Sequence, residues 1–163
     1  DSCVAHCPQP VTADFAPYLL ERAQLYMNND QARNAMLDYD AYYKAVNRQV
    51  NDLFYYYREQ AALKARQYQR ALDDIVKAIE LSPKDLTYRA EHAVVNLRVG
   101  RYEESMKILN EILKDEPKYG EAYRLLGLCQ IQLKKTDEAC GNFNKAKELG
   151  DPNVDELIKK YCK

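Results

Sequence analysis

Apolar and polar residues alternate along this chain with the spacing of amphipathic helices. Near the end of the chain, apolar side chains return three or four positions apart at Ala139, Phe143, Ala146 and Leu149, with mostly polar residues between them. This spacing places the apolar residues on one face of a helix. Short polar stretches such as residues 134–136 read as turns between helices. The pattern therefore predicts an all-α protein.

Small residues and prolines recur along the chain with a period of 34 residues. Pro83 and Pro117 are separated by this step, and Ala71, Ser105 and Ala139 keep it as well. A fixed period of this size is typical of stacked repeats, each built as a helix–turn–helix unit. We expect the small residues to lie where the two helices of a unit cross. The prolines would end each second helix, because proline cannot continue the hydrogen-bond ladder.

The period divides the chain into an arm, four units and a cap. We expect an irregular N-terminal arm at residues 1–15, helix pairs at about 16–51, 52–85, 86–119 and 120–151, and a capping helix at 152–163. The offset from the first unit to the second is 34, 35 or 36 residues, depending on which landmarks are matched. Gly100 falls where a helix needs a left-handed C-terminal residue. Thr136 or Asp137 is expected to cap the second helix of the last unit.

One residue breaks the pattern of small residues. Glu59 occupies the place that Ala93 and Gly127 hold in the next two units. We expect the register to slip there by one or two residues, toward Ala61 or Ala62. The alternative is that this carboxylate is partly buried.

Composition narrows the class of partner. The 163 residues are 47% hydrophobic, enough for one compact unit with a continuous core. Lys and Arg (24) nearly balance Asp and Glu (25), so charge gives no reason to expect nucleic acid or an anionic membrane. No stretch approaches the roughly 18 apolar residues of a membrane span. The chain begins at Asp1 instead of a methionine, which predicts a processed or excised piece.

Few residues are candidates for chemistry. The two histidines, His6 and His92, belong to no Ser/His/Asp set, and the chain has neither a glycine-rich phosphate loop nor an HExxH motif. Cys3, His6 and Cys7 lie close in sequence, but zinc needs a fourth ligand. We therefore expect a small disulfide, free thiols or a frayed end there. The sequence predicts no catalytic residue, no metal site and no cofactor.

Tyrosines are the most suggestive surface candidates. Residues 55–57 are three consecutive tyrosines, with Tyr42 and Tyr43 before them. Three neighbours on a helix cannot all face one core. We expect Tyr56 to be the half-exposed one. Two interpretations remain open for the group, namely peptide recognition and packing between repeats.

These landmarks resemble the tetratricopeptide repeat family over residues 16–151. The matching residues in the last unit are Tyr123, Leu126, Gly127, Ala139, Phe143 and Ala146. The resemblance implies an α-α superhelix (a solenoid) of about four helix pairs, whose first helices line a concave groove that binds peptides or proteins without catalysis. Two local stretches, at residues 54–61 and 138–163, are also similar to tetratricopeptide proteins of Bacteroides-type bacteria.

The resemblance also assigns positions to the groove. It places one continuous concave face at Tyr56, Gln60, Leu63, Lys64, Leu97, Arg98, Arg124 and Leu128. Chaperone-binding members grip a peptide's terminal carboxylate with a Lys/Asn/Lys/Arg set, and here those positions hold Tyr56, Gln60, Ala90 and Val94. That clamp is therefore expected to be absent. The expected partner is another protein or peptide.

The cysteines give an indication of the cell compartment in which the protein works. Cys129 falls among leucines and is expected to be a buried thiol. Cys140 lies ten residues before Gly150 and Cys162 twelve after it, so the two come level across the last helical hairpin. A disulfide is expected there, with two reduced thiols as the alternative. Such a bond requires an oxidising compartment, which favours a peptide-binding module of the bacterial cell envelope, located in the periplasm. A regulatory or dimerising segment of a larger protein is the second hypothesis.

Overall fold

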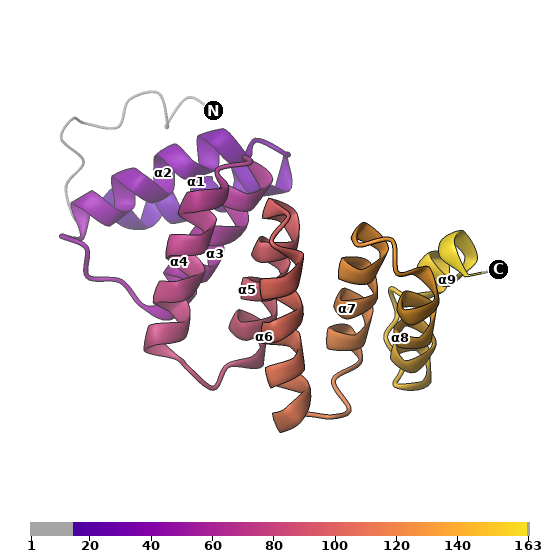
Figure 1. Ribbon diagram of the computed structural model, residues 1–163. Coiled ribbons are helices and arrows are strands. Elements are labelled where there is room, and N and C mark those ends of the chain that lie inside the picture. The colour runs from indigo at the N-terminus through magenta and orange to yellow at the C-terminus, as the bar shows by residue number, and fades with distance from the viewer. Residues whose placement is uncertain (1–14, 163) are drawn as a thin grey trace. The chain divides into compact units, whose positions relative to one another are not determined.

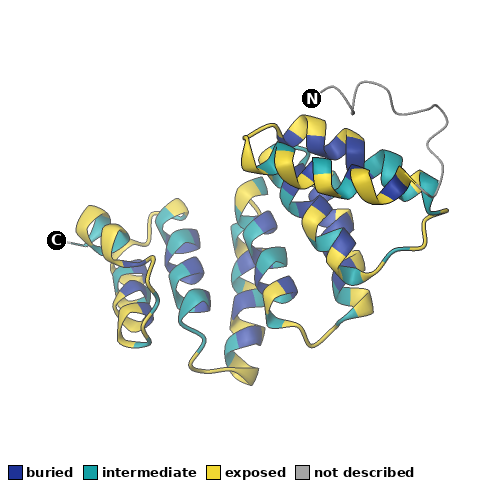
Figure 2. Ribbon diagram, turned by 180° about the vertical axis from the view of Figure 1, so that it is seen from behind, coloured by how far each residue is buried: buried dark blue, intermediate teal, exposed yellow. Residues whose placement is uncertain are grey.

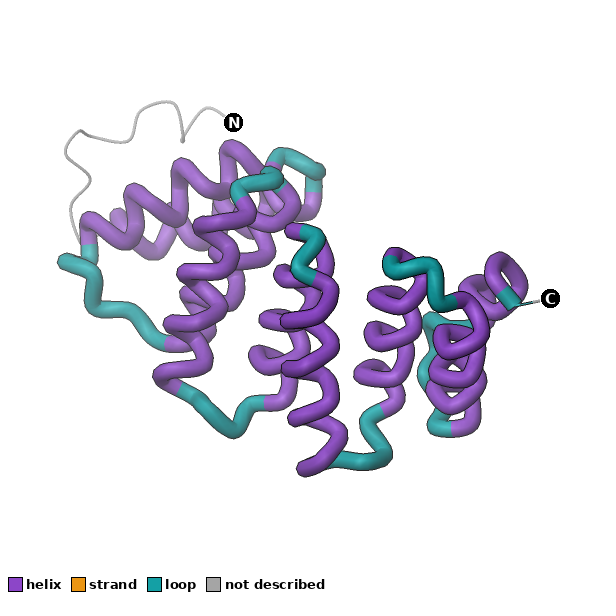
Figure 3. Tube along the Cα trace, in the orientation of Figure 1, coloured by secondary structure: helices purple, strands orange, loops and turns teal. Residues whose placement is uncertain are grey.

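The computed structural model describes residues 15–162, and within that range it is helical without any strand (Figures 1 and 3). The helices are α1 (Ala16–Asn28), α2 (Ala32–Ala45), α3 (Asp52–Lys64), α4 (Tyr68–Leu81), α5 (Leu86–Val99), α6 (Tyr102–Asp115), α7 (Gly120–Gln132), α8 (Thr136–Glu148) and α9 (Asp155–Tyr161). The all-α prediction is confirmed. The predicted arm, with Cys3, His6 and Cys7, lies outside the described residues apart from Phe15.

Contacts divide the chain into two compact units where the composition suggested one. Unit 1 ends at Ser82 and contains α1–α4, and unit 2 begins at Pro83 and contains α5–α9. Within each unit, consecutive helices form hairpins: α1 packs on α2, α3 on α4, α5 on α6 and α7 on α8. A stacked repeat contacts only its neighbours, so a long array can separate into smaller bodies.

Helix starts follow the predicted period, with one change. The first helices α3, α5 and α7 begin at Asp52, Leu86 and Gly120, in steps of 34 residues. From α1 to α3 the step is 36, from Ala16 to Asp52, which settles the offset that the sequence left open. The two additional residues lie in the α2–α3 connection, residues 46–51, whereas residues 82–85 connect α4 to α5.

The expected register slip at Glu59 is wrong. Because the helix starts keep their step, Glu59 occupies the same place on α3 as Ala93 on α5, and its side chain is fully buried. Ala61 and Ala62 are also fully buried, but at their own positions on the helix. The alternative interpretation, an acid in the core, is the correct one.

Small residues do lie where hairpin helices cross. Ala71, Ser105 and Ala139 are all fully buried, as predicted. The hydroxyl of Ser105 on α6 donates a 2.7 Å hydrogen bond to the carbonyl oxygen of Ala93 on α5, so the two backbones approach closely. Figure 2 shows how buried and exposed positions alternate along the helices, while the connecting turns are largely exposed.

The turn inside each hairpin repeats one backbone conformation. The same turn position has a positive φ in every hairpin, at Asp30 (57°), Arg66 (60°), Gly100 (86°) and Lys134 (60°). The next amide then donates to the carbonyl five residues earlier, as Lys135 does to Gln130 at 2.8 Å. This is the bonding pattern of a Schellman helix end. The left-handed residue predicted at Gly100 is confirmed.

The predicted cap of α8 at Thr136 or Asp137 is wrong. Lys135 is the N-cap residue and makes no side-chain capping bond, and Thr136 is already helical. Only Lys135 separates the left-handed Lys134 from the first helical residue, so the N-cap position falls on a lysine. Asp137 and Glu138 instead lie in the first turn, where acidic groups favour the positive end of the helix dipole.

A short final helix covers the last hairpin. Val154 is fully buried in one cluster with Ala139, Phe143 and Ala146 of α8. Leu157, Ile158 and Tyr161 of the predicted capping stretch pack against that cluster. The apolar face of α9 therefore closes the core of unit 2.

Candidate functional site

The groove positions predicted in unit 1 all lie on α3. Tyr56, Gln60 and Leu63 are half-buried, and Lys64 is exposed. The Lys64 ammonium pairs with Asp30 at 2.6 Å, which ties the end of α3 to the α1–α2 turn. Exposed pairs of this kind are worth about 0–1 kcal/mol, so a ligand carboxylate would be able to displace Asp30.

The groove positions predicted in unit 2 lie on α5 and α7, which contact each other. Leu97 on α5 and Leu128 on α7 are half-buried and pack against the same core cluster. Arg98 is exposed and makes no ion pair with the described residues. The structure thus brings three of the predicted residues onto a shared helix pair. That they continue the α3 positions as one concave face stays a prediction.

Arg124, the fourth predicted residue of unit 2, is engaged within its own unit. Its Nε donates to Asp151 at 2.9 Å and its Nη2 to Glu121 at 2.7 Å. The side chain of Asp151 is almost completely buried, so this arginine fastens α7 to the turn between α8 and α9. A ligand at Arg124 would have to compete with two carboxylates.

Tyr56 is partly exposed, as predicted, but it is not the most exposed tyrosine of residues 55–57. Tyr57 is the exposed member, at 43%, whereas Tyr55 and Tyr56 are half-buried. The rings of Tyr56 and Tyr57 lie 5.5 Å apart. Helix geometry requires that the three rings face different directions, but the segments packed beside α3 decide which ring stays exposed.

A buried arginine explains much of the aromatic content of unit 1. Arg58 donates to both carboxylate oxygens of Asp74, from Nε at 2.8 Å and from Nη2 at 2.6 Å. Its guanidinium lies over the rings of Tyr43, at 4.7 Å, and Phe54, at 5.1 Å. Cations over ring faces are attracted by the negative face of the π-system. Tyr43 of α2 therefore packs against α3 of the next hairpin, in agreement with the interpretation of packing between repeats.

Tyr55 belongs to the same cluster. Its hydroxyl oxygen lies 3.3 Å from that of Tyr43, and the two share a hydrogen bond. This bond, together with burial, raises the pKa of Tyr55 to about 12. Packing within unit 1 therefore accounts for Tyr55 as well.

Sequence reasoning missed this ion pair, although a signal was present. Arg22 and Asp38 in the first hairpin form the same bidentate contact, at 2.5 and 2.6 Å. Arg22 to Asp38 and Arg58 to Asp74 have the same spacing of 16 residues. An arginine and an aspartate that recur at the same positions of successive repeats therefore indicate a buried ion pair.

Unit 1 also contains an open pocket of about 810 Å³, which the sequence did not reveal. Its lining comes from α1, α2, α3 and the α2–α3 connection, at Leu20, Glu21, Gln24, Tyr39, Tyr42, Gln49, Val50, Asn51, Leu53, Phe54 and Tyr57. Every residue of α1 and α3 is described. These two helices do not pack closely against each other, whereas α5 and α7 of unit 2 are in contact. Part of the pocket lining comes from the longer connection, residues 46–51.

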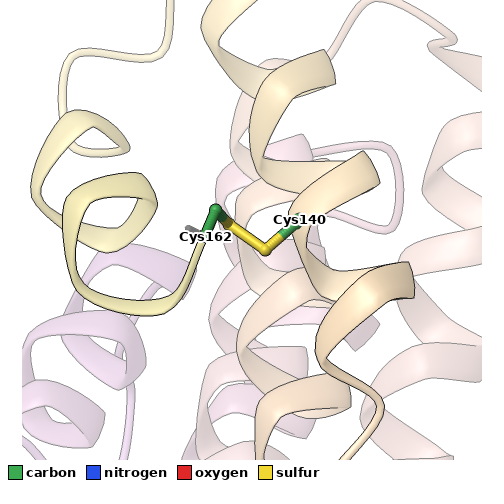
Figure 4. Close-up of a disulfide and its surroundings, with 2 residues drawn as sticks. All are labelled: Cys140 and Cys162. Carbon is green, nitrogen blue, oxygen red and sulfur yellow. A yellow bond between two sulfur atoms is a disulfide. The ribbon is translucent and has the colours of Figure 1, made fainter.

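A disulfide joins Cys140 on α8 to Cys162 at the end of α9 (Figure 4). The Cα atoms are 5.6 Å apart, a normal span for this bond.

Cys129 remains a free, fully buried thiol that donates to Ser105 Oγ at 3.4 Å. Burial raises the pKa of Cys129, which keeps the thiol protonated and unreactive.

Groups suited to chemistry are sparse in residues 15–162. In that range no three His, Cys, Asp or Glu side chains lie close enough together to hold a metal ion. Burial lowers the pKa of His92, which packs half-buried on α5. None of the described helices is both long enough and apolar enough to span a bilayer.

Comparison with known families agrees with the helix pairs. The family model "Anaphase-promoting complex, cyclosome, subunit 3" matches residues 28–112, more than half of the chain, and the model "Tetratricopeptide repeat" matches residues 90–154. The chain belongs to the tetratricopeptide repeat family.

Relatives share this repeat region over part of their length. The chain is 30% identical over 99 residues to small glutamine-rich tetratricopeptide repeat-containing protein 2 of Mycosarcoma maydis, covering 61% of this chain and 28% of that protein. It is 32% identical over 101 residues to heat shock protein STI1 of Saccharomyces cerevisiae, covering 60% and 17%. The chain thus spans less than a third of the length of these curated relatives.

Solved structures share the tetratricopeptide fold. YrrB, described as a TPR protein with an unusual peptide-binding site, superimposes with a TM-score of 0.73 and 17% identity, covering 89% of this chain and 74% of YrrB. A MamA structure gives 0.68 and 21%, covering 90% and 81%. The first TPR of RPAP3, bound to an HSP90 peptide, gives 0.60 and 21%, covering 68% and 87%. At such identities the likeness shows the fold alone.

Proposed function

We propose that this chain is a non-enzymatic scaffold that binds a protein or peptide through the faces of its first helices. Support comes from the family, from solved neighbours described with a peptide-binding site or a bound peptide, and from the sparse chemistry of the described residues. Tetratricopeptide helices present surfaces for recognition, and the residues that we predict for the groove belong to α3, α5 and α7.

The face formed by α5 and α7 is the observation that carries this proposal. Leu97 and Leu128 are half-exposed above one core, and the guanidinium of Arg98 has no ion-pair partner among the described residues. Arginine is one of the residues enriched in binding hot spots, and the surrounding contacts exclude water from it. The absent carboxylate clamp argues against a chaperone-type acidic tail, because Ala90, at one clamp position, is buried in the core.

Selection from a random peptide library with the full chain tests this function. We expect the Arg98→Glu variant to lose about tenfold in affinity for a selected peptide, because the exposed charge is reversed. Lys107→Glu is the matched control, since Lys107 is an exposed cation on α6 that lies outside the predicted groove. Failure to select any peptide, or equal losses in both variants, would contradict the proposal.

We also propose that the chain works in the bacterial cell envelope, in the periplasm, like the exported tetratricopeptide proteins of Bacteroides-type bacteria that it resembles. The disulfide between Cys140 and Cys162 supports an oxidising compartment. Mass spectrometry of non-reduced protein taken from its native cells is the test. Recovery of both cysteines as alkylated free thiols would count against this location.

A second candidate is a dimerising or regulatory segment of a larger multidomain protein. Three leucines of unit 1, Leu25, Leu37 and Leu81, are each more than half exposed. Exposed apolar residues of this size can form an interface when they gather in one patch. Sedimentation velocity across a range of concentrations separates the two functions. A concentration-dependent dimer that Leu37→Ser abolishes would favour this candidate, and a monomer throughout would exclude it.

A further inference from the structure

The pocket of unit 1 has apolar and aromatic walls. Tyr39 and Phe54 are buried residues of its lining, with ring centroids 5.9 Å apart and edge-on geometry. Leu53 and Tyr57 of α3 are exposed lining residues, and Leu20 of α1 also lines the pocket. Binding pockets of this type have volumes of roughly 300–1,000 Å³ and mainly apolar walls. The walls therefore suit the methylene groups of a side chain.

The described lining of the pocket carries only negative charge. Glu21 is the single charged side chain among its described lining residues, and it makes no ion pair with any described residue. Two of the lining amides have local partners: Gln24 donates to Asn28 at 3.4 Å, and Asn51 accepts from the Phe54 amide as the cap of α3. By contrast, the carboxylate of Asp74 is matched by an arginine of this chain.

We propose that this pocket binds the side chain of a lysine or arginine presented by a partner polypeptide. The aliphatic stem of either residue would pack between the apolar walls, and its cationic head would meet Glu21 and the face of Tyr57. A purely apolar side chain would strip water from Glu21 without compensation, and a phosphate or carboxylate would be repelled by it. The pocket is larger than one side chain needs, which leaves space for the adjoining backbone.

This inference rests on the proposed binding of a peptide or protein, and it names the residue that the partner must present. It concerns the pocket of unit 1 and is independent of Arg98, which lies in unit 2. Burial and the neighbouring Tyr57 raise the pKa of Tyr39 to about 12, so its phenol remains neutral and adds no competing charge at physiological pH.

Small probes test the pocket without knowledge of the natural partner. Two-dimensional NMR of the full chain would follow titrations with N-acetyl-lysine amide, N-acetyl-arginine amide and the neutral isostere N-acetyl-norleucine amide. We expect both cationic probes to shift the amides of Leu20, Leu53 and Tyr57, with a weaker response to added norleucine amide. The response should also weaken with rising salt.

Variants separate charge recognition from simple apolar binding. Glu21→Gln keeps the shape of the side chain and is expected to weaken both cationic probes about fivefold. Glu111→Gln, on an exposed carboxylate of α6, is the matched control and should leave the affinity unchanged. Because both positions are exposed, neither change should affect folding, and circular dichroism checks this.

Two results would overturn the inference. Equal binding of the norleucine probe, unaffected by Glu21→Gln, would make this a pocket for apolar side chains. No shift of the lining amides with any probe would mean that the pocket does not bind such side chains. In either case, peptide binding that depends on Arg98 would leave the proposed function standing.

Discussion

Two glycines of unit 2, one crowded and one in open space, show how closely its helices pack. A Cβ atom added at Gly127 would lie 2.4 Å from Cε1 of the Phe143 ring, which is itself fully buried. A Cβ added at Gly141 would meet nothing within 4 Å. Gly127 therefore lets α7 approach α8, whereas Gly141 only loosens the middle of α8.

We expect alanine to have opposite effects at these two glycines. Gly127→Ala should lower the free energy of unfolding by about 1–3 kcal/mol, because the Phe143 ring must move in a filled core. Gly141→Ala should raise it by about 0.5–1 kcal/mol through the better helix propensity of alanine. Urea unfolding of both variants measures the difference. A Gly127→Ala protein as stable as wild type would show that the helices can separate freely.

The repeated left-handed turn provides a second residue-scale prediction. Lys134 has a φ of 60° at the position that Gly100 occupies in the preceding hairpin. Lys134→Gly should stabilise unit 2 by about 0.5–1 kcal/mol, because the relief of left-handed strain exceeds the added entropy of the unfolded chain. Gly100→Ala, the mirror change, should destabilise by about 1 kcal/mol. Thermal unfolding compares them, and the same sign for both would refute the argument.

At the scale of helices, unit 1 holds its hairpins together with charge as well as apolar contact. Arg22–Asp38 joins α1 to α2, and Arg58–Asp74 joins α3 to α4, both across buried or half-buried surfaces. Arg58 also reaches Asp40 on α2 at 3.5 Å, so it links the two hairpins. Burial of an ion pair adds little net stability, but loss of one partner leaves an uncompensated charge.

Removal of one partner from this pair should therefore be costly. We expect Asp74→Ala to cost about 3–5 kcal/mol, and the double change Arg58→Met with Asp74→Leu to cost much less, since no charge remains buried. Asp115→Ala is the control, because its pair with Arg89 is exposed and worth about 0–1 kcal/mol. Guanidinium unfolding gives the three values. If Asp74→Ala matched Asp115→Ala, the buried pair would have no special role.

Across the whole molecule, both units combine apolar packing with ion pairs, and among the described residues the disulfide belongs to unit 2 alone. Unit 1 contains buried ion pairs and aromatic rings around Arg58. Unit 2 contains apolar clusters and the Cys140–Cys162 bond, which closes a loop of 22 residues over α8 and α9. A change of redox conditions should consequently act on one unit and leave the other unaffected.

Reduction of the disulfide should destabilise unit 2 by about 3 kcal/mol in the chain-entropy model. Hydrogen exchange followed by mass spectrometry would resolve the effect, with faster exchange in α8 and α9 and unchanged exchange in α1–α4. The double variant Cys140→Ser with Cys162→Ser is the control, because it should behave like the reduced protein with or without reductant. Equal acceleration in both units would contradict this assignment.

Local pattern was sufficient for the features that depend on short stretches of chain. The 34-residue period, the small residues at the crossings and the left-handed Gly100 all follow from side-chain size, helical spacing and backbone conformation. The cysteine pair also follows, because two helices joined by a short turn keep their register. These features concern which residues share a helix face or lie level across one hairpin.

Only the tertiary structure determined which residues each helix face contacts. It buried Glu59 in the core, made Tyr57 the most exposed of the three consecutive tyrosines, and opened a pocket lined by α1, α2 and α3. It also gave Lys64 and Arg124 carboxylate partners from distant turns. A periodic sequence sets the direction in which a side chain points along its own helix. Its neighbours come from segments many residues away, and their approach depends on connection lengths and packing that no single helix encodes.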